Sequence, residues 1–387
     1  MVEKFIAERI VQRYALAGGD ENLRTCARLL HVAPDAKSVN LVLGGLEKAF
    51  AGRAANQFPE ELKMAVTEAL KEDAAGQHLS LGVRVGHPGA LTAAMKIITD
   101  EKAAKDRRLE LIRLFGEVSQ PSCILPLLKV VHDSPDVSIR LMTLASLQRY
   151  DDPNIAKVVL EAYPTRFNDD LRAGAQALLA SRPTWALVFL REIDAGYVSP
   201  RSVSLEIVRT FKRYSDKKIV ELVEKHWGKV RASTAAEKLA EMERVAKVIA
   251  AGKGDAAAGK VAFANTCAKC HKLFGEGGQV GPELTGYERD NLRYWLENIV
   301  DPSASIRDEY VAFVIETKDG RTLTGIIVAQ DKATVSLRQN DGQTIRLARE
   351  QIEDLAASPI SLMPEDVLKE LKDQQLRDLF AYLMKKK

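Results

Sequence analysis

Apolar residues recur along the first two-thirds of the chain with the spacing of amphipathic helices. From about residue 100, positions i, i+3, i+4 and i+7 are apolar in one segment after another, which predicts helices with one buried face. The segments form pairs that repeat about every 31–34 residues, a period typical of an α-solenoid. The apolar lines of the four pairs lie at 111–114 and 124–128, 142–147 and 155–160, 173–179 and 185–190, and 205–208 and 219–223.

These helix pairs resemble HEAT repeats. Residues 1–100 are predicted to be more degenerate members of the same stack, because glycine and proline interrupt the pattern at Gly18-Gly19, Phe58-Pro59 and Gly86–Gly89. A charged helix is predicted from Thr234 to Ala250, and a glycine-containing stretch follows it. We therefore predict a HEAT-like helical repeat domain over residues 1–250 and a second domain over residues 251–387.

Within the second domain, the apolar period changes to two between about residues 309 and 357. Alternation of this kind predicts strands. The turn residues Lys318-Asp319-Gly320 and Asn340-Asp341-Gly342 separate neighbouring runs, as expected for hairpins. We predict a small antiparallel sheet inserted in a helical domain, with strands near 310–315, 322–328, 334–337 and 344–347.

The charge balance argues against a nucleic-acid-binding protein, and the lengths of the apolar runs argue against a membrane-spanning chain. The chain has 387 residues, enough for two or three domains, with 56 basic and 53 acidic residues and a net charge of +3. This near balance argues against a nucleic-acid-binding protein, which normally has a marked basic excess. No apolar run approaches the length of a membrane span, and residues 1–5 lack the features of a signal peptide.

Two of the four cysteines, Cys26 and Cys123, fall in separate apolar helical segments. A disulfide between them requires Cα atoms within about 7 Å, which an extended helical stack does not favour. We predict two buried thiols that pack as small apolar side chains.

The other two cysteines form the motif Cys267-Ala268-Lys269-Cys270-His271. C-x-x-C-H is the attachment pattern of haem c: both sulfurs add to vinyl groups on one porphyrin edge, and the following histidine ligates the iron. One alternative is a zinc site, which needs a fourth ligand, and no second cysteine pair or nearby histidine supplies it. The other is a reduced dithiol, whose usual βαβ context is missing. The motif predicts one covalently attached haem c.

The flanks of this motif resemble class I cytochrome c. Gly259 and Phe263 lie four residues apart before the motif, Gly281-Pro282 follows a glycine-rich loop, and the last helix carries an apolar stripe that includes Leu379. The resemblance implies that the first and last helices cross at Gly259, Phe263, Leu379 and Tyr382. It also implies that the carbonyl of Pro282 accepts a hydrogen bond from His271, which orients the ring.

The sixth iron ligand is predicted to be Met363. Only Met363 and Met384 follow the motif. Met363 stands in Ser361-Leu362-Met363-Pro364, an irregular segment before the last helix, where class I cytochromes present their axial methionine. Met384 is expected to be a side chain at the end of the terminal helix. Methionine ligation raises the potential and fills the sixth position, which favours an electron carrier.

Other candidates have weaker support. Tyr294 and Trp295 are candidates for a hydrogen bond to a haem propionate, although both also suit core packing. Three lysines near the motif are candidates for a positive docking rim, or for an ordinary solvated face. The remaining histidines are expected at the surface or at helix ends. The lysines are Lys260, Lys269 and Lys272, and the histidines are His31, His78, His87, His132 and His226.

The run Asn298–Ser303, the strands that follow and the segment Ser361–Pro364 together are similar to haem-binding domains of planctomycetes and Verrucomicrobia. In that family a β-rich insertion separates the Cys-Cys-His motif from the axial methionine, and HEAT-like repeats often precede the domain. The resemblance implies a periplasmic protein that passes electrons from a dehydrogenase partner or fused domain to a respiratory acceptor such as a cytochrome or an oxidase. Because haem c is attached outside the cytoplasm, we expect that the N-terminus is truncated and that an export signal is missing.

The predicted fold class is mainly α: a HEAT-like α-solenoid followed by a class I cytochrome c domain with a small antiparallel β insertion. The predicted function is that of a periplasmic monohaem c-type cytochrome. The alternatives are a haem-containing dehydrogenase or peroxidase subunit and a haem-based sensor scaffold. An enzyme needs an open iron position and catalytic residues, and the sequence contains no nucleophile–base pair and no phosphate-binding loop.

Overall fold

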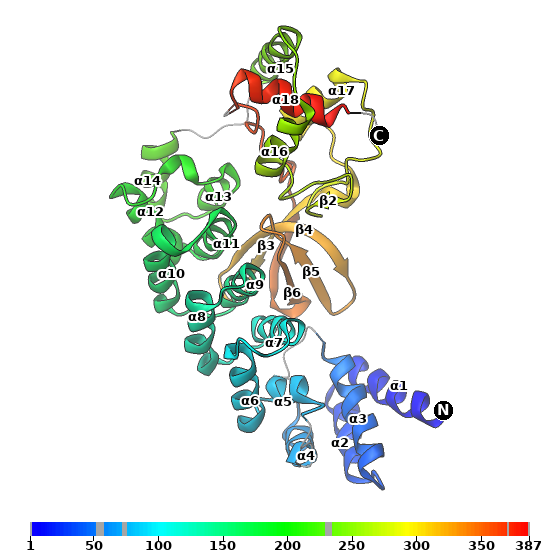
Figure 1. The fold of residues 1–387 in the computed structure, drawn as a ribbon. Coiled ribbons are helices and arrows are strands. Elements are labelled where there is room, and N and C mark those ends of the chain that lie inside the picture. The colour runs from blue at the N-terminus through cyan, green and yellow to red at the C-terminus, as the bar shows by residue number, and fades with distance from the viewer. Residues whose placement is uncertain (1, 52–57, 72–75, 229–233, 370, 386–387) are drawn as a thin grey trace. The chain divides into compact units, whose positions relative to one another are not determined.

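A computed structural model describes residues 2–51, 58–71, 76–228, 234–369 and 371–385 (Figure 1). The fold is mainly α-helical, and a cytochrome c region with small antiparallel sheets follows the helices, which confirms the predicted fold class at this level. The chain forms two compact units. The first comprises Met1–Leu178, Asp331–Val335 and Ile345–Gln351, and the second comprises Leu179–Gln330, Ser336–Thr344 and Ile352–Lys387.

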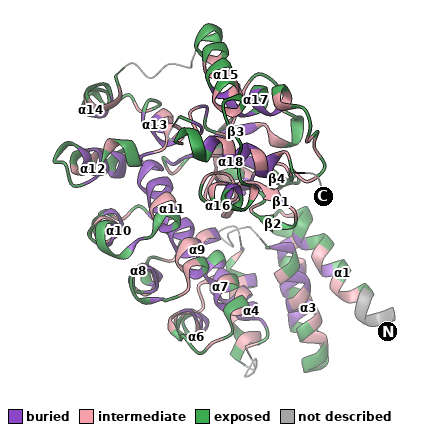
Figure 2. Ribbon diagram, turned by 45° about the horizontal axis from the view of Figure 1, so that its top comes forward, coloured by how far each residue is buried: buried purple, intermediate pink, exposed green. Residues whose placement is uncertain are grey.

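The helices of the first unit follow the apolar periodicity of the sequence. They alternate between two layers, because α7 packs on α9, α6 packs on α8, and α8 packs on α10. Figure 2 shows buried residues along the helix faces that meet between these layers. The helices are α1 (Val2–Ala17), α2 (Asp20–His31), α3 (Ala36–Ala49), α4 (Glu60–Lys71), α5 (Leu79–Val85), α6 (Pro88–Thr99), α7 (Lys105–Glu117), α8 (Ile124–Asp133), α9 (Val137–Leu147), α10 (Pro153–Arg166) and the start of α11 (Asp169–Ala180).

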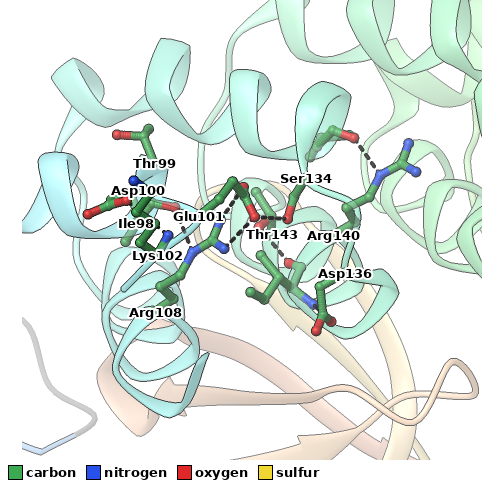
Figure 3. Close-up of polar contacts among 12 residues, drawn as sticks. Ile98, Thr99, Asp100, Glu101, Lys102, Arg108, Ser134, Asp136, Arg140 and Thr143 are labelled. Carbon is green, nitrogen blue, oxygen red and sulfur yellow. Dashed lines mark hydrogen bonds and ion pairs between the residues drawn. The ribbon is translucent and has the colours of Figure 1, made fainter. Parts of the chain in front are cut away.

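A repeated arginine links successive helices of this unit. Arg108, Arg140 and Arg172 stand 32 residues apart in the sequence. Each donates to a carbonyl near the end of the preceding helix: that of Ile98 at 3.1 Å, that of Val131 at 2.7 Å and that of Pro164 at 3.4 Å, respectively. Figure 3 shows Arg108 beside Ile98, and Arg140 in the next repeat. The spacing of these contacts matches the period of the apolar pattern and supports a repeat architecture, and its assignment to HEAT repeats stays a prediction.

Cys26 and Cys123 are free and fully buried thiols, as predicted. The Cys123 Sγ lies 3.0 Å from the hydroxyl oxygen of Tyr150. Burial raises the pKa of Cys26 to about 11 and that of Cys123 to about 12. Both therefore remain protonated at neutral pH and pack as small apolar groups.

The second unit begins with the end of the helical series and continues into the haem-motif region. The last predicted helix pair is confirmed, and the charged helix starts at Ala235 with Thr234 as its N-cap. The helices are α12 (Pro183–Asp194), α13 (Leu205–Phe211), α14 (Lys217–Trp227), α15 (Ala235–Ala250), α16 (Ala256–Thr266), α17 (Leu292–Val300) and α18 (Asp373–Leu383).

The β insertion forms a five-stranded sheet in the order β6-β5-β4-β3-β7. β3 pairs antiparallel with both β4 and β7, and the predicted turns contain Gly320 and Gly342 with positive φ. β7 was not predicted, because it is an edge strand whose residues are mostly exposed and lack an apolar alternation. The strands are β3 (Ala312–Thr317), β4 (Thr322–Gln330), β5 (Thr334–Arg338), β6 (Thr344–Ala348) and β7 (Ile352–Ala357).

Within the second unit, the sheet is attached to the end of the helical series. The amide of Thr322 on β4 donates to the carbonyl of Ser181 at 2.9 Å. Arg182 donates to the carbonyl of Asp319 at 2.6 Å, and Arg213 forms an ion pair with Glu316 at 2.9 Å. The predicted domain boundary after residue 250 stays a proposal. These contacts join the helices before this boundary to the sheet after it.

Replacing Arg108 with methionine should destabilise the protein. Arg108 is 2% exposed and donates to Ile98 and, through both terminal nitrogens, to Glu101. Loss of these charge-assisted hydrogen bonds should lower the free energy of unfolding by about 2 kcal/mol, measured by urea denaturation with far-ultraviolet circular dichroism.

Arg107→Met is the matched control, because Arg107 is only partly buried and pairs with the exposed Glu110 on the same helix, an ion pair worth less than about 1 kcal/mol. The hydrogen bond from Arg108 lowers the pKa of Glu101. The effect should therefore be complete above the ordinary glutamate pKa of about 4.3 and shrink as the pH falls through the folded-state pKa. Equal destabilisation by both variants would contradict this role.

Candidate haem-binding site

The frame of the site is the crossing of α16 and α18. At Gly259 a Cβ atom would overlap the backbone oxygen of Asp378 and approach the Cβ of Tyr382 to 2.8 Å, so only glycine permits this approach. Phe263 and Tyr382 pack with ring centroids 5.6 Å apart, and the side chain of Asp378 accepts from the amide of Asp255 at 2.8 Å. The helix crossing expected from the sequence is confirmed.

The Cys-Cys-His motif begins at the C-terminal end of α16. Its backbone forms a helical turn, because the amides of Cys270 and His271 both donate to the carbonyl of Cys267, at 3.1 and 2.9 Å. The loop after the motif returns against it, and the amide of Gly278 donates to the carbonyl of Ala268 at 2.7 Å. A Cβ at Gly278 would overlap the backbone of this turn, so the glycine-rich loop keeps the motif compact.

His271 is held in one orientation. Its Nδ1 lies 2.9 Å from the carbonyl oxygen of Pro282, so Nδ1–H donates and Nε2 keeps its lone pair for a metal. A Cβ at Gly281 would lie 2.5 Å from Cε1 of the ring, so glycine makes room for the imidazole. Burial lowers the pKa of His271, although the hydrogen bond to Pro282 acts in the opposite direction. The ring is therefore neutral, as a ligand must be.

The two motif cysteines are half-buried free thiols. Burial, together with the neighbouring Cys270, raises the pKa of Cys267 to about 12. Burial, together with Glu206, also raises the pKa of Cys270. Dithiol redox chemistry requires a thiolate, which these raised pKa values disfavour. Within the described residues, no three His, Cys, Asp or Glu side chains are grouped to hold a metal ion, so the zinc alternative gains no support.

Met363 lies partly buried against the same core as the motif. This core contains Phe263, Trp295 and Leu379, with Cys267 packed against it. The irregular segment around Met363 is ordered by serines: the amide of Met363 donates to Ser361 Oγ, and the amide of Ser361 donates to Ser303 Oγ, both at 3.1 Å. Met384 also packs at the edge of this core, but it is the C-cap residue of α18.

Trp295 provides an independent test of whether the site fits a haem. Its side chain is 3% exposed, and its indole Nε1 has no hydrogen-bond partner in the described part of the chain. Buried donors are nearly always satisfied, so a haem propionate would fit here. Tyr294 packs edge-on to Trp295 at 6.1 Å and stacks on Tyr287 at 5.9 Å, so core packing and a propionate contact both remain compatible with Tyr294.

The candidate docking lysines are not equivalent. Lys260 forms an ion pair with Glu276 at 2.8 Å, so its charge is partly neutralised. Lys269 is exposed and Lys272 is half-buried. The histidines outside the motif lie at helix ends, as expected, and His78 is also buried beside Glu47. They cap or end α2, α5, α6, α8 and α14 as His31, His78, His87, His132 and His226, respectively.

Two features of the site were not predicted. One is a short hairpin whose strands have two residues each, β1 (Lys272–Leu273) and β2 (Glu276–Gly277). Its turn places Phe274 at a φ of 53°. The other is Arg289, which lies over the Phe274 ring at 4.5 Å and donates to the carbonyls of Leu284 and Leu383 at 2.9 and 2.7 Å. Arg289 thus ties the loop after Pro282 to the end of α18. Nothing in its sequence context distinguishes it from a surface arginine.

Comparison with known families agrees with this geometry. Residues 256–357, about a quarter of the chain, match the cytochrome c family model. This region is therefore a cytochrome c-like haem-binding domain, and the family implies covalent haem c, electron transfer and redox partners. The match includes the Cys-Cys-His motif and the strands and ends before Met363 and α18. No curated protein matches the chain.

The residues present fit a haem c. The oriented neutral imidazole of His271 and the two adjacent thiols are the groups that attach and ligate this cofactor, and the unpartnered indole of Trp295 suits a propionate. Within the residues that the structure describes, no helix is both long and apolar enough to span a bilayer.

Replacing Gly281 with alanine should disturb His271 selectively. The new methyl group would meet the imidazole ring, and such overpacking costs about 1–3 kcal/mol. We expect a lower midpoint of urea unfolding and a lower yield of attached haem.

Gly286→Ala is the matched control, because a Cβ at Gly286 meets no atom within 4 Å and its φ is not in the positive range. It should behave as wild type in both measurements. A Gly281→Ala protein with unchanged stability and haem content would show that the close contact with the ring does not matter.

Proposed function

We propose that this protein is a c-type cytochrome that carries single electrons on one haem c. The observation that supports this most strongly is the imidazole of His271, which is oriented by Pro282. Cys267, from the same motif, and Met363 both pack against one core. A histidine with a methionine on the opposite side is the ligand set of electron-transfer cytochromes c.

Each residue has a defined task in this proposal. Cys267 and Cys270 hold the cofactor by thioether bonds, and His271 and Met363 hold its iron. The indole of Trp295 donates to a propionate, and Tyr294 packs beside it. When bound, the haem supplies a reversible one-electron couple. Two protein ligands held by ordered segments would limit reorganisation during electron transfer.

The setting is also part of the proposal. The combination of repeats, β insertion and distal methionine supports the planctomycete and Verrucomicrobia type of haem-binding domain, and with it a periplasmic location, a dehydrogenase donor and a respiratory acceptor. The helical repeats would hold the cytochrome near its donor or offer a docking surface, as stacked repeats commonly do.

The test is the visible spectrum of protein matured with the cytochrome c apparatus. Reduced wild type should show sharp α and β bands. Oxidised wild type should show the weak far-red charge-transfer band of methionine-ligated haem. Met363→Ala should lose that band, because the thioether is gone, while Met384→Ala should keep it.

The competing functions predict other spectra. A peroxidase, a dehydrogenase subunit with its own active site or a haem sensor needs an accessible iron position. Rapid carbon monoxide binding by reduced wild type would favour them over an electron carrier. Retention of the far-red band in Met363→Ala would refute the assignment of Met363.

A further inference from the structure

Helix α15 packs into the haem domain although it precedes the region that matches cytochrome c. Its residue Val245 is fully buried in the core that contains Phe263, Trp295 and Leu379. The helix packs on both α17 and α18, and these helices lie together in Figure 1. α15 therefore contributes to the environment of the haem site from outside the matched residues 256–357.

One side chain of α15 reaches the segment that carries Met363. The Nζ of Lys238 lies 2.5 Å from Oδ1 of Asp301 and 3.3 Å from Oε1 of Glu365. The Lys238 side chain is only 12% exposed, and that of Glu365 is 6% exposed. A capping box between Thr234 and Glu237 fixes the start of α15, in the turn that also contains Lys238.

The two partners of Lys238 lie on two different segments: the end of α17 and the segment that carries Met363. Asp301 is the C-cap of α17, the helix that carries Trp295. Glu365 follows Met363 by two residues. The hydrogen bond from Ser361 to Ser303 joins the same two segments on the other side of the methionine. The Met363 segment is thus fastened to the end of α17 at both flanks, by Ser303 before the methionine and by Lys238 after it.

Electrostatics make the lysine hard to replace. Without it, the carboxylates of Asp301 and Glu365 would lose the cation that both contact, and removing a charged partner from a buried carboxylate such as that of Glu365 is destabilising. The repulsion between the two carboxylates would be reduced if the segment 361–365 moved away from the end of α17. The core of the domain is held separately, by the crossing at Gly259, so this movement need not unfold it.

We propose that Lys238 is a positioning residue for the axial ligand: it holds the segment 361–365 against the end of α17 so that the thioether of Met363 stays on the iron. The inference rests on the proposed function. A thioether is a weak ligand, so its occupancy depends on how tightly the protein holds it.

The experiment compares Lys238→Met with wild type in the haem-loaded full chain. Two readouts report on the ligand: the far-red charge-transfer band of the oxidised protein, and the affinity of added imidazole, which binds ferric iron by displacing methionine. We expect the band to weaken or vanish and the imidazole affinity to rise about tenfold or more, equivalent to about 1.4 kcal/mol. Lys238→Arg should restore both toward wild type, because it keeps the cation.

Lys247→Met is the matched control, because Lys247 is an exposed lysine on the same helix, and it should leave both readouts unchanged. Far-ultraviolet circular dichroism of each variant separates loosening of the segment from unfolding. If Lys238→Met does not fold, Glu365→Gln serves as the second variant, since it removes the charge at the other end of the contact and should shift both readouts in the same direction.

The outcomes separate this inference from the function on which it rests. If wild type has no methionine-dependent band, the proposed ligand set is wrong. If the band is present and lost in Met363→Ala, but folded Lys238→Met (or Glu365→Gln in its place) keeps the band and the wild-type imidazole affinity, the role of Lys238 is refuted and the ligand set stands.

Discussion

The close approach of α16 and α18 at Gly259 is the constraint on which the haem domain depends. The backbone of Asp378 occupies the space where any larger residue would place its Cβ, and the side chain of Asp378 caps the start of α16 through Asp255. This contact joins segments more than a hundred residues apart. It creates the core against which the Cys-Cys-His turn, Trp295 and the Met363 segment all pack.

The two sides of the site are supported by different means. His271 is ordered locally, by Pro282 and by the glycine-rich loop that folds back on the motif. The Met363 segment lies beyond the β insertion and is ordered by distant contacts, through Ser303 and Lys238. The insertion itself is attached to the last helices of the series through Ser181 and Arg182. The insertion therefore separates the Cys-Cys-His motif from Met363 in sequence, while Cys267 and Met363 still pack against the same core.

Much of this was predictable from the sequence. The helix pairs from residue 105 onward and strands β3–β6 follow from apolar periodicity, and the contact between His271 and Pro282 follows from the resemblance to class I cytochromes. β7 was missed because an exposed edge strand needs no apolar alternation, and the β1–β2 hairpin because two-residue strands carry no period. The contacts of Lys238 could not be predicted, because a lysine on a charged helix is normally expected to face solvent and its partners are 63 and more residues away. The ligand roles themselves stay predictions.

The most direct test of the central claim is nuclear magnetic resonance of the reduced protein with ¹³C-labelled methionine methyl groups. The chain has seven methionines. A methyl group bound next to the iron lies directly over the porphyrin face, where the ring current shifts its signal far upfield. We predict one such methyl signal, absent from Met363→Leu. A spectrum in which all methionine methyl signals lie in the ordinary range would contradict the account, as would an upfield signal that survives in Met363→Leu.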